Sequence, residues 1–439
     1  MKKVEWRVKR QDEQFVARAV NRGMDEVAAR LLYNRGITDV DSAEAFFRAD
    51  TGALYDPMML NDMAAAVERI RHAVDSGEKI TIYGDYDVDG ITSVVILYRY
   101  FKSIGAQADY YIPDRHEEGY GLNEAALAKI KSGGTTLLIT VDTGTTAVAE
   151  ALTAQRLGLD LIVTDHHECK DDYPRCTALI NPKRRDSTYP FKDLAGVGVT
   201  FKLICALDGD WQKILSLYGD IVAVGTVADI MSLTGENRAL VSYGLKLLAS
   251  RPSAGIRALL ECAGKYGKGP INAGVISFQL APRLNAAGRI GDPATSVRLL
   301  LCDRLDEARP LAQTLCEENR TRQAMEQSIL ADVQLMLRDR DPQDKIIVLG
   351  SQNWHQGVIG IVASRICEKY GKPCVLVCFE GDKAKGSARS VSGVSIFELL
   401  SRSSAHLERF GGHDMAAGLT LRADDFDAFV ADITANANS

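Results

Sequence analysis

The stretch that decides the fold is Ile80-Thr81-Ile82-Tyr83-Gly84-Asp85-Tyr86-Asp87-Val88-Asp89-Gly90. A short apolar run, typical of a buried strand, leads into a glycine-bounded loop with three aspartates at alternate positions. Carboxylates crowded in this way repel one another unless divalent cations offset their charge. An EF-hand calcium loop is excluded because its twelfth position, a glutamate in that motif, is Ile96 here. A solvated turn is disfavoured because the apolar residues 91–97 predict a buried helix directly afterwards.

Two further apolar runs end in metal-binding residue types. Asp142 follows residues 137–141, and Asp165-His166-His167 follows residues 161–164. The carboxyl ends of parallel strands lie at one edge of a sheet, so these side chains are predicted to form one metal site with the first loop. Either aspartate alone could instead cap a helix, and the residues by themselves leave that alternative open. Histidine beside carboxylates suits Mn²⁺, Zn²⁺ or Fe²⁺, whereas all-oxygen sites suit Mg²⁺, and Mn²⁺ is the ion favoured here.

Asp229 is a further candidate ligand. It ends the apolar stretch Val224-Gly225-Thr226-Val227-Ala228, and a carboxylate in such surroundings is costly unless it is paired or bound to metal. Two metal ions would bind a phosphoryl oxygen and activate a water, which is the chemistry of phosphodiester or phosphoanhydride hydrolysis. The sequence contains no Gly-x-Ser-x-Gly motif or P-loop that would indicate a competing chemistry.

Length and composition limit the remaining possibilities. A chain of 439 residues predicts two or three domains. The net charge of −6 argues against a broad nucleic-acid surface, so any such surface is expected to be local, for example at Lys183-Arg184-Arg185. No apolar run approaches the roughly 20 residues of a membrane span. Nine cysteines without a Cys-x-x-Cys pair indicate reduced thiols in a cytoplasmic protein, without disulfides or a zinc cage.

The pattern of strands and helices predicts an α/β fold, in which a parallel-sheet domain is joined by a long helix to a smaller α/β domain. The expected parts are an N-terminal helical cap (1–57), the catalytic domain (58–303), the connecting helix (304–342) and a substrate-binding domain (343–439). Strands are expected at 80–83, 108–112, 137–141, 160–163 and 178–180, and then at 346–349, 375–379 and 386–390.

The motifs, taken in order, resemble those of the DHH phosphoesterase superfamily. The superfamily match rests on Gly84 to Gly90, Val141-Asp142-Thr143-Gly144, Asp165-His166-His167 and Val227-Ala228-Asp229. Further segments are similar to the RecJ family of single-strand-specific 5′→3′ DNA exonucleases, with catalytic DHH and substrate-binding DHHA1 domains. These segments are Ile112-Pro113-Asp114-Arg115, Gly119-Tyr120-Gly121-Leu122, Ala281 to Arg289, Trp354 to Gly360 and Gly411 to Gly418.

The resemblance implies roles for individual residues. Two divalent ions, Mn²⁺ in preference to Mg²⁺, would be bound by Asp85, Asp87, Asp89, Asp142, His166 and Asp229, with Asp85 either a ligand or a partner of one. Asp165 would orient the histidines, and His167 would lie beside the scissile phosphate, so these two are the expected catalytic residues. The expected substrate-binding residues are Arg115, Arg283, Asn285, Arg289, His355, Ser387, Arg389, Gly412 and His413.

The activity that the resemblance implies is metal-dependent 5′→3′ hydrolysis of single-stranded DNA to mononucleotides, in DNA repair and recombination. A cytoplasmic monomer is expected, with single-stranded DNA as substrate, a single-strand-binding protein or a helicase as partner, and no membrane association. One alternative is a phosphodiesterase for short oligoribonucleotides or cyclic dinucleotides, and another is a non-catalytic nucleic-acid-binding scaffold. RecJ proteins usually carry an OB-fold after the second domain, and none is expected before Ser439.

Overall fold

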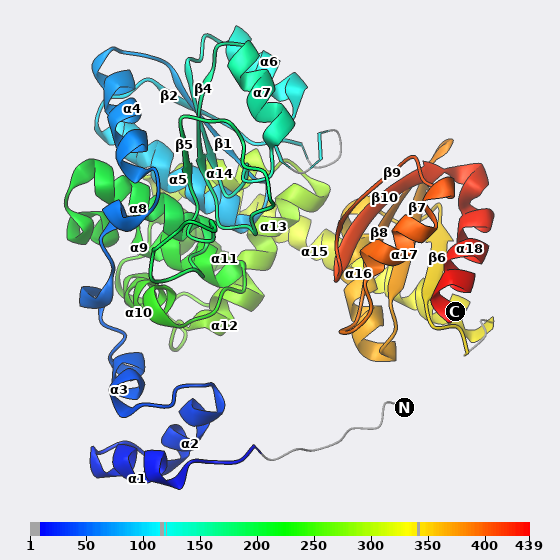
Figure 1. The fold of residues 1–439 in the computed structure, drawn as a ribbon, viewed down its shortest axis with the longest axis horizontal. Helices are drawn as coiled ribbons and strands as arrows, with labels where there is room; N and C mark the ends of the chain where they lie inside the picture. The colour runs from blue at the N-terminus through cyan, green and yellow to red at the C-terminus, as the bar shows by residue number, and fades with distance from the viewer. Residues whose placement is uncertain (1–8, 115–117, 120, 340–342) are drawn as a thin grey trace. The chain divides into compact units, whose positions relative to one another are not determined.

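The computed structural model describes residues 9–114, 118–119, 121–339 and 343–439. The chain divides into two compact units, Arg7–Glu318 and Asn319–Ser439. The long helix α15 (Leu305–Met336) contains this division (Figure 1). An α/β fold with a parallel sheet, a long helix and a second, smaller sheet was expected, and that expectation is confirmed. The domain boundaries expected from the sequence stay predictions.

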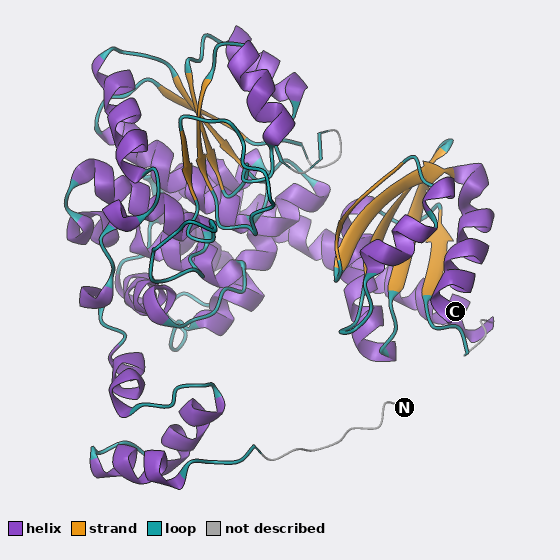
Figure 2. Ribbon diagram, viewed as in Figure 1, coloured by secondary structure: helices purple, strands orange, loops and turns teal. Residues whose placement is uncertain are grey.

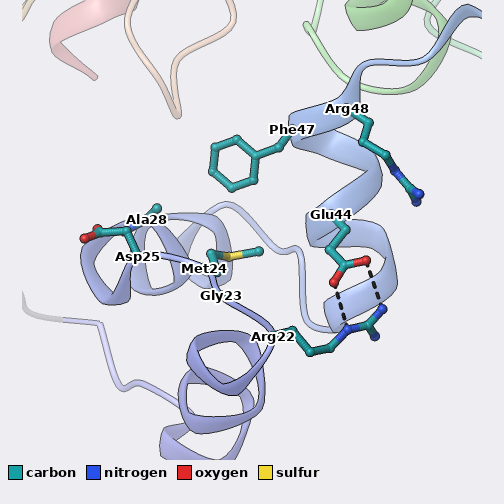
Figure 3. A pocket seen from close by; sticks show the side chains of 8 residues that line it. All are labelled: Arg22, Gly23, Met24, Asp25, Ala28, Glu44, Phe47 and Arg48. Atoms are coloured by element: carbon teal, nitrogen blue, oxygen red, sulfur yellow. Dashed lines mark hydrogen bonds and ion pairs between the residues drawn. The ribbon is translucent and has the colours of Figure 1, made fainter.

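The first unit begins with three short helices that have their own small core. Each helix starts at an aspartate whose side chain accepts backbone N–H groups: Asp12, Asp25 and Asp39. A shallow hollow between the helices contains Met24 and Phe47, and beside it Arg22 forms a two-pronged ion pair with Glu44 (Figure 3). The elements up to the first strand are α1 (Glu13–Asn21), α2 (Glu26–Asn34), α3 (Val40–Arg48), η1 (Thr51–Ala53), η2 (Pro57–Met59) and α4 (Met63–Asp75).

The first sheet is wholly parallel, with strand order β2-β1-β3-β4-β5. Its strands lie within one residue of the expected positions: β1 (Ile80–Gly84), β2 (Ala108–Tyr111), β3 (Leu137–Val141), β4 (Asp160–Thr164) and β5 (Ala178–Ile180). Both faces are buried, which explains why the strands are continuous apolar runs. Ile80 and Ile82 lie in the larger core, whereas Tyr83 lies in a second core on the opposite face.

Helices cover both faces of this sheet (Figure 2). The register pairs Gly84 with Val141 and Val141 with Thr164, so that Asp85, Asp142 and Asp165 leave the same edge. The remaining helices of the first unit are α5 (Val88–Ser103), α6 (Glu124–Ser132), α7 (Val148–Arg156), α8 (Gly196–Asp208), α9 (Trp211–Ala228), α10 (Gly235–Ser250), α11 (Ala254–Cys262), α12 (Ala273–Val275), the π-helix η3 (Ile276–Leu280), α13 (Ala281–Ile290) and α14 (Ala294–Leu301).

The second unit contains a mixed sheet with strand order β6-β7-β8-β10-β9, in which only β6 and β7 are parallel. Strands β6, β7 and β8 were expected from the sequence, whereas β9 and β10 were not. The ion pairs of buried Glu326 with Arg322 (2.6 Å) and Arg365 (2.7 Å) join α15 to α16 within this unit. Its elements after α15 are η4 (Leu337–Asp339), β6 (Ile347–Ser351), α16 (Gln356–Tyr370), β7 (Cys374–Glu380), β8 (Lys383–Arg389), α17 (Ile396–Arg402), η5 (Ser404–His406), β9 (Arg409–His413), β10 (Ala416–Arg422), η6 (Ala423–Asp425) and α18 (Phe426–Asn438).

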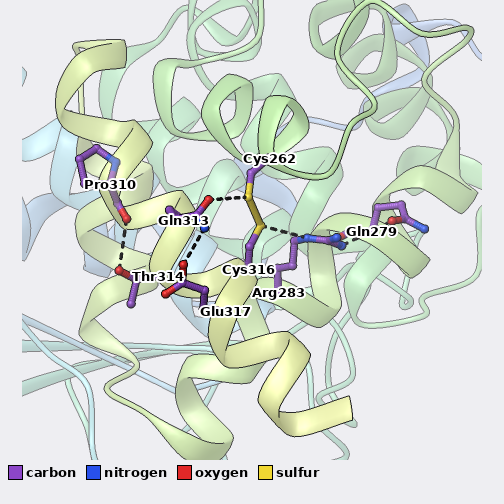
Figure 4. Close-up of a disulfide and its surroundings, with 8 residues drawn as sticks. All are labelled: Cys262, Gln279, Arg283, Pro310, Gln313, Thr314, Cys316 and Glu317. Atoms are coloured by element: carbon purple, nitrogen blue, oxygen red, sulfur yellow. Dashed lines mark hydrogen bonds between the residues drawn. A yellow bond between two sulfur atoms is a disulfide. The ribbon is translucent and has the colours of Figure 1, made fainter. Parts of the chain in front are cut away.

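The expectation that no cysteine forms a disulfide is wrong at one pair. The structure joins Cys262, at the end of α11, to Cys316 of α15 (Figure 4). These residues are 54 positions apart, and only the fold brings them together, so their spacing carried no signal. The other cysteines are free. None of the described helices combines the length and apolar character needed to cross a membrane.

Candidate metal centre

The acidic loop after β1 is held in shape by its own backbone. Asp87 caps α5, because its Oδ1 accepts the N–H groups of Asp89 (2.9 Å) and Gly90 (3.1 Å). A Cβ at Gly90 would lie 2.6 Å from the carbonyl oxygen of Asp85, so only glycine allows this turn. Asp85 and Asp89 are buried. The loop therefore directs carboxylates from both of its ends toward the carboxyl edge of the sheet.

Asp142 and Asp165 do not cap helices. The alternative in which these aspartates serve as helix caps is therefore excluded. The N-caps of the next helices after these residues are Ala147 and Ala195. Asp142 has a φ of +59°, a left-handed conformation that aspartate tolerates better than most residues, and its N–H donates to Thr164 O at 2.9 Å. Its buried carboxylate faces the interior of the site.

His166 connects the acids that come from different elements. Its Nε2 lies 3.1 Å from Asp142 Oδ1, 3.6 Å from Asp229 Oδ2 and 3.8 Å from Asp89 Oδ2. Asp229 is the C-cap residue of α9 and retains 27% side-chain exposure. Buried His166 Nε2 and Asp142 Oδ1 make no hydrogen bond of good geometry within the described part of the chain. Buried polar atoms left in this state are what a metal ion would satisfy.

His167 makes its closest ion pair with Asp165. Its Nδ1 lies 2.7 Å from Asp165 Oδ1, which also accepts the backbone N–H of both histidines (2.7 and 3.1 Å). The other oxygen of Asp165 accepts the N–H of Thr145 at 2.9 Å. Asn181 Nδ2 donates to the carbonyl oxygen of His167 at 2.9 Å. These contacts fix the position of the imidazole and saturate the Asp165 carboxylate.

Burial and mutual repulsion raise the pKa of three of the acids, whereas the contact with His167 lowers the pKa of the fourth, Asp165. Burial, and then the neighbouring carboxylates, raise the pKa of Asp89 and Asp142 well above the usual range. Burial and Asp87 raise the pKa of Asp229 to about 6. Burial opposes ionisation of Asp165 too, but the hydrogen bond and charge of His167 outweigh it, so the pKa of Asp165 is lowered.

The two histidines are also shifted apart. Burial, and then the charge of His167, lower the pKa of His166 to about 4, so it is neutral and able to bind a metal at neutral pH. Burial also acts to lower the pKa of His167. The hydrogen bond that its imidazolium donates to Asp165 outweighs this effect and raises the pKa to about 9. His167 is therefore a cation at neutral pH, whereas His166 is a lone-pair donor.

Three overlapping groups of side chains have the geometry of a metal site. In each group the candidate ligand atoms lie within 4.8 Å of one another. All six predicted metal ligands belong to at least one group, and Asp142 and His166 belong to two. The groups are Asp85, Asp87 and Asp142; Asp89, His166 and Asp229; and Asp142, His166 and His167. This donor set of carboxylates and imidazole fits two divalent ions.

Helix α8 gives Asp89 a support that was not expected from the sequence. The N–H groups of Gly196 and Val197, at the start of this helix, donate to Asp89 Oδ2 (2.7 Å) and Oδ1 (2.8 Å). A helix N-terminus stabilises a carboxylate through its free amides and dipole. A Cβ at Gly196 would lie 2.6 Å from Asp142 Oδ1, so this position has room only for glycine. The glycine next to an apolar helical run was the available signal.

Three of the predicted substrate residues of the first unit lie on one helix, α13, which packs on the acidic loop. Helix α13 carries Arg283, Asn285 and Arg289, all half-buried. A Cβ at Gly288 would lie 2.8 Å from the carbonyl oxygen of Tyr86, so α13 packs directly on that loop. Arg283 donates from Nη1 to Gln279 O (2.6 Å) and from Nε to Cys316 Sγ (3.3 Å). The prediction for Arg115 lies outside the described residues.

The predicted substrate residues of the second unit gather on β8, β9 and the start of α16. Arg389 and His413 pair with the same residue, Ala416 of β10, from opposite sides. Arg389 Nη1 donates to Ser387 Oγ at 3.1 Å, and a Cβ on Gly360 of α16 would lie 2.8 Å from that oxygen. His355 caps α16, and Gly412, with a φ of +145°, lies on the edge strand β9.

The role of the basic segment 183–185 as a local nucleic-acid surface stays a prediction. Each of its side chains forms an ion pair with a carboxylate in the structure. The pairs are Lys183 with Glu168, Arg184 with Asp62 and Arg185 with Asp171.

Comparison with known protein families identifies the class of protein that this fold and site define. Residues 79–226 match the model of the DHH family, N-terminal domain, and residues 343–439 match the DHHA1 domain. The chain is 41% identical over 426 residues to the single-stranded-DNA-specific exonuclease RecJ of Bacillus subtilis strain 168, covering 96% of this chain and 54% of that protein. It is 38% identical over 423 residues to the protein of the same name from Escherichia coli K12, covering 91% and 72%. The chain belongs to the RecJ family.

Solved structures agree with this assignment. A crystal structure of exonuclease RecJ bound to manganese matches with a TM-score of 0.77 and 37% identity, covering 86% of this chain and 94% of that one. RecJ of Thermus thermophilus in complex with Mn²⁺ matches with a TM-score of 0.81 and 33% identity, covering 97% and 60%. The resemblance seen in the sequence motifs is confirmed. The chain spans about half the length of the Bacillus subtilis relative.

Proposed function

We propose that this chain is a metal-dependent exonuclease that hydrolyses single-stranded DNA from its 5′ end to mononucleotides, in DNA repair and recombination. The observation that carries the proposal is the set of three overlapping ligand groups at the carboxyl edge of the parallel sheet, in a member of the RecJ family. Relatives described as bound to Mn²⁺ or Mg²⁺ support two divalent ions as cofactors. Asp85, Asp87, Asp89, Asp142, His166 and Asp229 would hold them.

When bound, the two ions would activate a water molecule and stabilise the charge that develops on the phosphoryl group. The residues of the chain prepare the site for this reaction. The amides of Gly196 and Val197 orient the Asp89 carboxylate before any ligand arrives. Asp165 keeps His167 protonated, so that its Nε2–H can donate to a phosphoryl oxygen or to the leaving oxygen. His167 is the proposed catalytic residue, and Asp165 positions it.

The proposed substrate contacts lie on elements of both units. On α13, Arg283, Asn285 and Arg289 would bind phosphates near the 5′ end, since guanidinium groups bind phosphate bidentately. In the second unit, the residues that would contact phosphates are His355, Ser387, Arg389, Gly412 and His413. Arg115 would be an additional contact in the first unit. We also propose that the protein acts as a cytoplasmic monomer. A helicase or a single-strand-binding protein would supply it with opened strands.

Digestion of end-labelled DNA tests the proposal. A long single strand labelled at either end is incubated with the protein and Mn²⁺, with Asp142→Asn as the inactive control and a matched duplex as a second substrate. Stepwise release of mononucleotides from the 5′ end of the single strand alone is expected. Shortening from the 3′ end would refute the polarity. Turnover of a dinucleotide without cleavage of the long strand would instead identify a small-substrate phosphodiesterase.

A further inference from the structure

Ile230 has a backbone conformation and an exposure that its own packing does not explain. Its φ is +58°, in the left-handed region that β-branched residues rarely enter because Cβ crowds the carbonyl oxygen. Its side chain is 89% exposed, so burial of apolar surface does not offset this strain. Glycine is the usual residue just after a helix, and it would end α9 without backbone strain. Strain of this kind is characteristic of functional positions.

The segment around Ile230 is fixed in place, so its exposure does not come from a loosely packed loop. The N–H of Ile230 donates to Val227 O at 3.2 Å, which closes the last turn of the helix. Met231, the next residue, packs against the main core. Buried Asn237 donates from Nδ2 to Ser232 O at 3.2 Å and holds the following residues. The chain thus presents one apolar side chain to solvent from a rigid support.

The position of Ile230 connects it to the candidate metal centre. It directly follows Asp229, whose Oδ2 lies 3.6 Å from His166 Nε2. Among the described residues, four other than glycine have a positive φ, and two of them, Asp142 and Ile230, are at or beside this site. Asp229 retains 27% side-chain exposure, so the site is open to solvent at the residue that directly precedes the exposed Ile230.

We propose that Ile230 contacts the base of the nucleotide whose phosphodiester bond lies at the metal centre. This inference rests on the function proposed above. A nucleotide held by its phosphate at the acid cluster leaves the apolar face of its base without a partner, and an exposed aliphatic side chain beside the cluster supplies one. Contacts to the face of a base are sequence-tolerant because every base has one. This property suits an enzyme that removes each nucleotide in turn.

The test combines one substitution with one change in the DNA. Ile230→Gly removes the side chain and relieves the backbone strain, so a loss of binding cannot be ascribed to a strained fold. Ala49→Gly is the matched control, because Ala49 also has a left-handed φ (+45°) but ends α3, in the N-terminal helices. Single-turnover release of the 5′-terminal nucleotide is measured against enzyme concentration. The two strands compared carry either a normal or an abasic 5′-terminal residue.

With the normal strand, Ile230→Gly should raise the half-saturating enzyme concentration about tenfold. With the abasic strand the change should stay below about twofold, because the contact is already absent. Mn²⁺ affinity should equal that of the wild type, and both glycine variants should be at least as thermostable. An equal loss on both strands, weaker Mn²⁺ binding or no loss at all would overturn the inference. If the wild type releases no 5′ nucleotide, the proposed function fails first and the inference fails with it.

Discussion

Replacing Gly196 by alanine should damage the metal centre without unfolding the protein. Gly196 is the first residue of α8, and its φ is not in the left-handed region, so alanine fits the backbone there. The added Cβ would lie 2.6 Å from Asp142 Oδ1 and 2.7 Å from Asp142 Cβ. These distances are roughly 1 Å shorter than ordinary van der Waals contact. Either Asp142 or the start of α8, which holds Asp89, must therefore move.

The structure sets the size of the expected effect. A displacement of about 1 Å in a catalytic group costs on the order of 100-fold in rate. Changes to residues that orient metal ligands cost about 10- to 100-fold in affinity or activity. We expect Gly196→Ala to lose about 10- to 100-fold in Mn²⁺ affinity and cleavage, or ~1.4–2.8 kcal/mol. Overpacking costs about 1–3 kcal/mol, and the higher helix propensity of alanine contributes about 0.5–1 kcal/mol of stability. Stability should therefore fall by at most about 2.5 kcal/mol.

Gly198→Ala is the control on the same helix. The three atoms nearest to a Cβ at Gly198 would be side-chain atoms of Leu194, the closest at 3.3 Å. Mn²⁺ binding is measured by titration calorimetry, cleavage by release of labelled nucleotide, and stability by urea unfolding. The reasoning is refuted if Gly196→Ala binds Mn²⁺ and cleaves DNA like the wild type. It is equally refuted if Gly198→Ala loses as much activity.

Three further predictions concern the acids and a buried ion pair. Asp142→Asn should lower cleavage at least about 100-fold. It should also raise the thermal stability of the metal-free protein, because it removes one of several repelling charges and asparagine tolerates the positive φ. Near-normal cleavage by this variant would contradict the assignment. Burial raises the pKa of Asp229 to about 6, so its contribution to metal-free stability is present at low pH and is lost as the pH rises through about 6. Mn²⁺ requires the ionised form, so the Mn²⁺-induced rise in Tm should grow over the same interval; a flat profile would exclude Asp229 as a ligand. Lys202→Met should cost about 3–5 kcal/mol in urea unfolding, because it leaves buried Glu236, 2.5 Å away, without its cation; the exposed Arg22→Ala should change stability little, and equal losses would show that burial does not decide the effect.

The central sheet could be predicted from the sequence because its chemistry is local. Strands buried on both faces need apolar side chains at every position, so each strand is a short uninterrupted run. In parallel strands the residues that follow each run share one edge, which brings Asp85, Asp142 and Asp165 together without any knowledge of the helices. The approximate location of the acid cluster therefore follows from strand order alone.

The features that the sequence did not predict depend on long-range packing. The amides of Gly196 and Val197 bind a carboxylate more than 100 positions earlier, and no local pattern encodes that contact. Strands β9 and β10 contain three glycines, Gly411, Gly412 and Gly418. Glycine is uncommon in strands, so these residues concealed the alternating pattern by which a strand is predicted. The strain at Ile230 is likewise a property of φ, which composition does not specify.

The opposite pKa shifts of the acids separate metal ligands from positioning groups. Asp165 is already paired with His167, which lowers its pKa, so it gains little from a further cation and serves instead to hold His167. Asp89, Asp142 and Asp229 have raised pKa values because burial and neighbouring negative charges disfavour their ionised forms. A divalent ion removes that penalty from several carboxylates at once. The groups least stable as anions in the metal-free fold are therefore those that gain most from binding the metal.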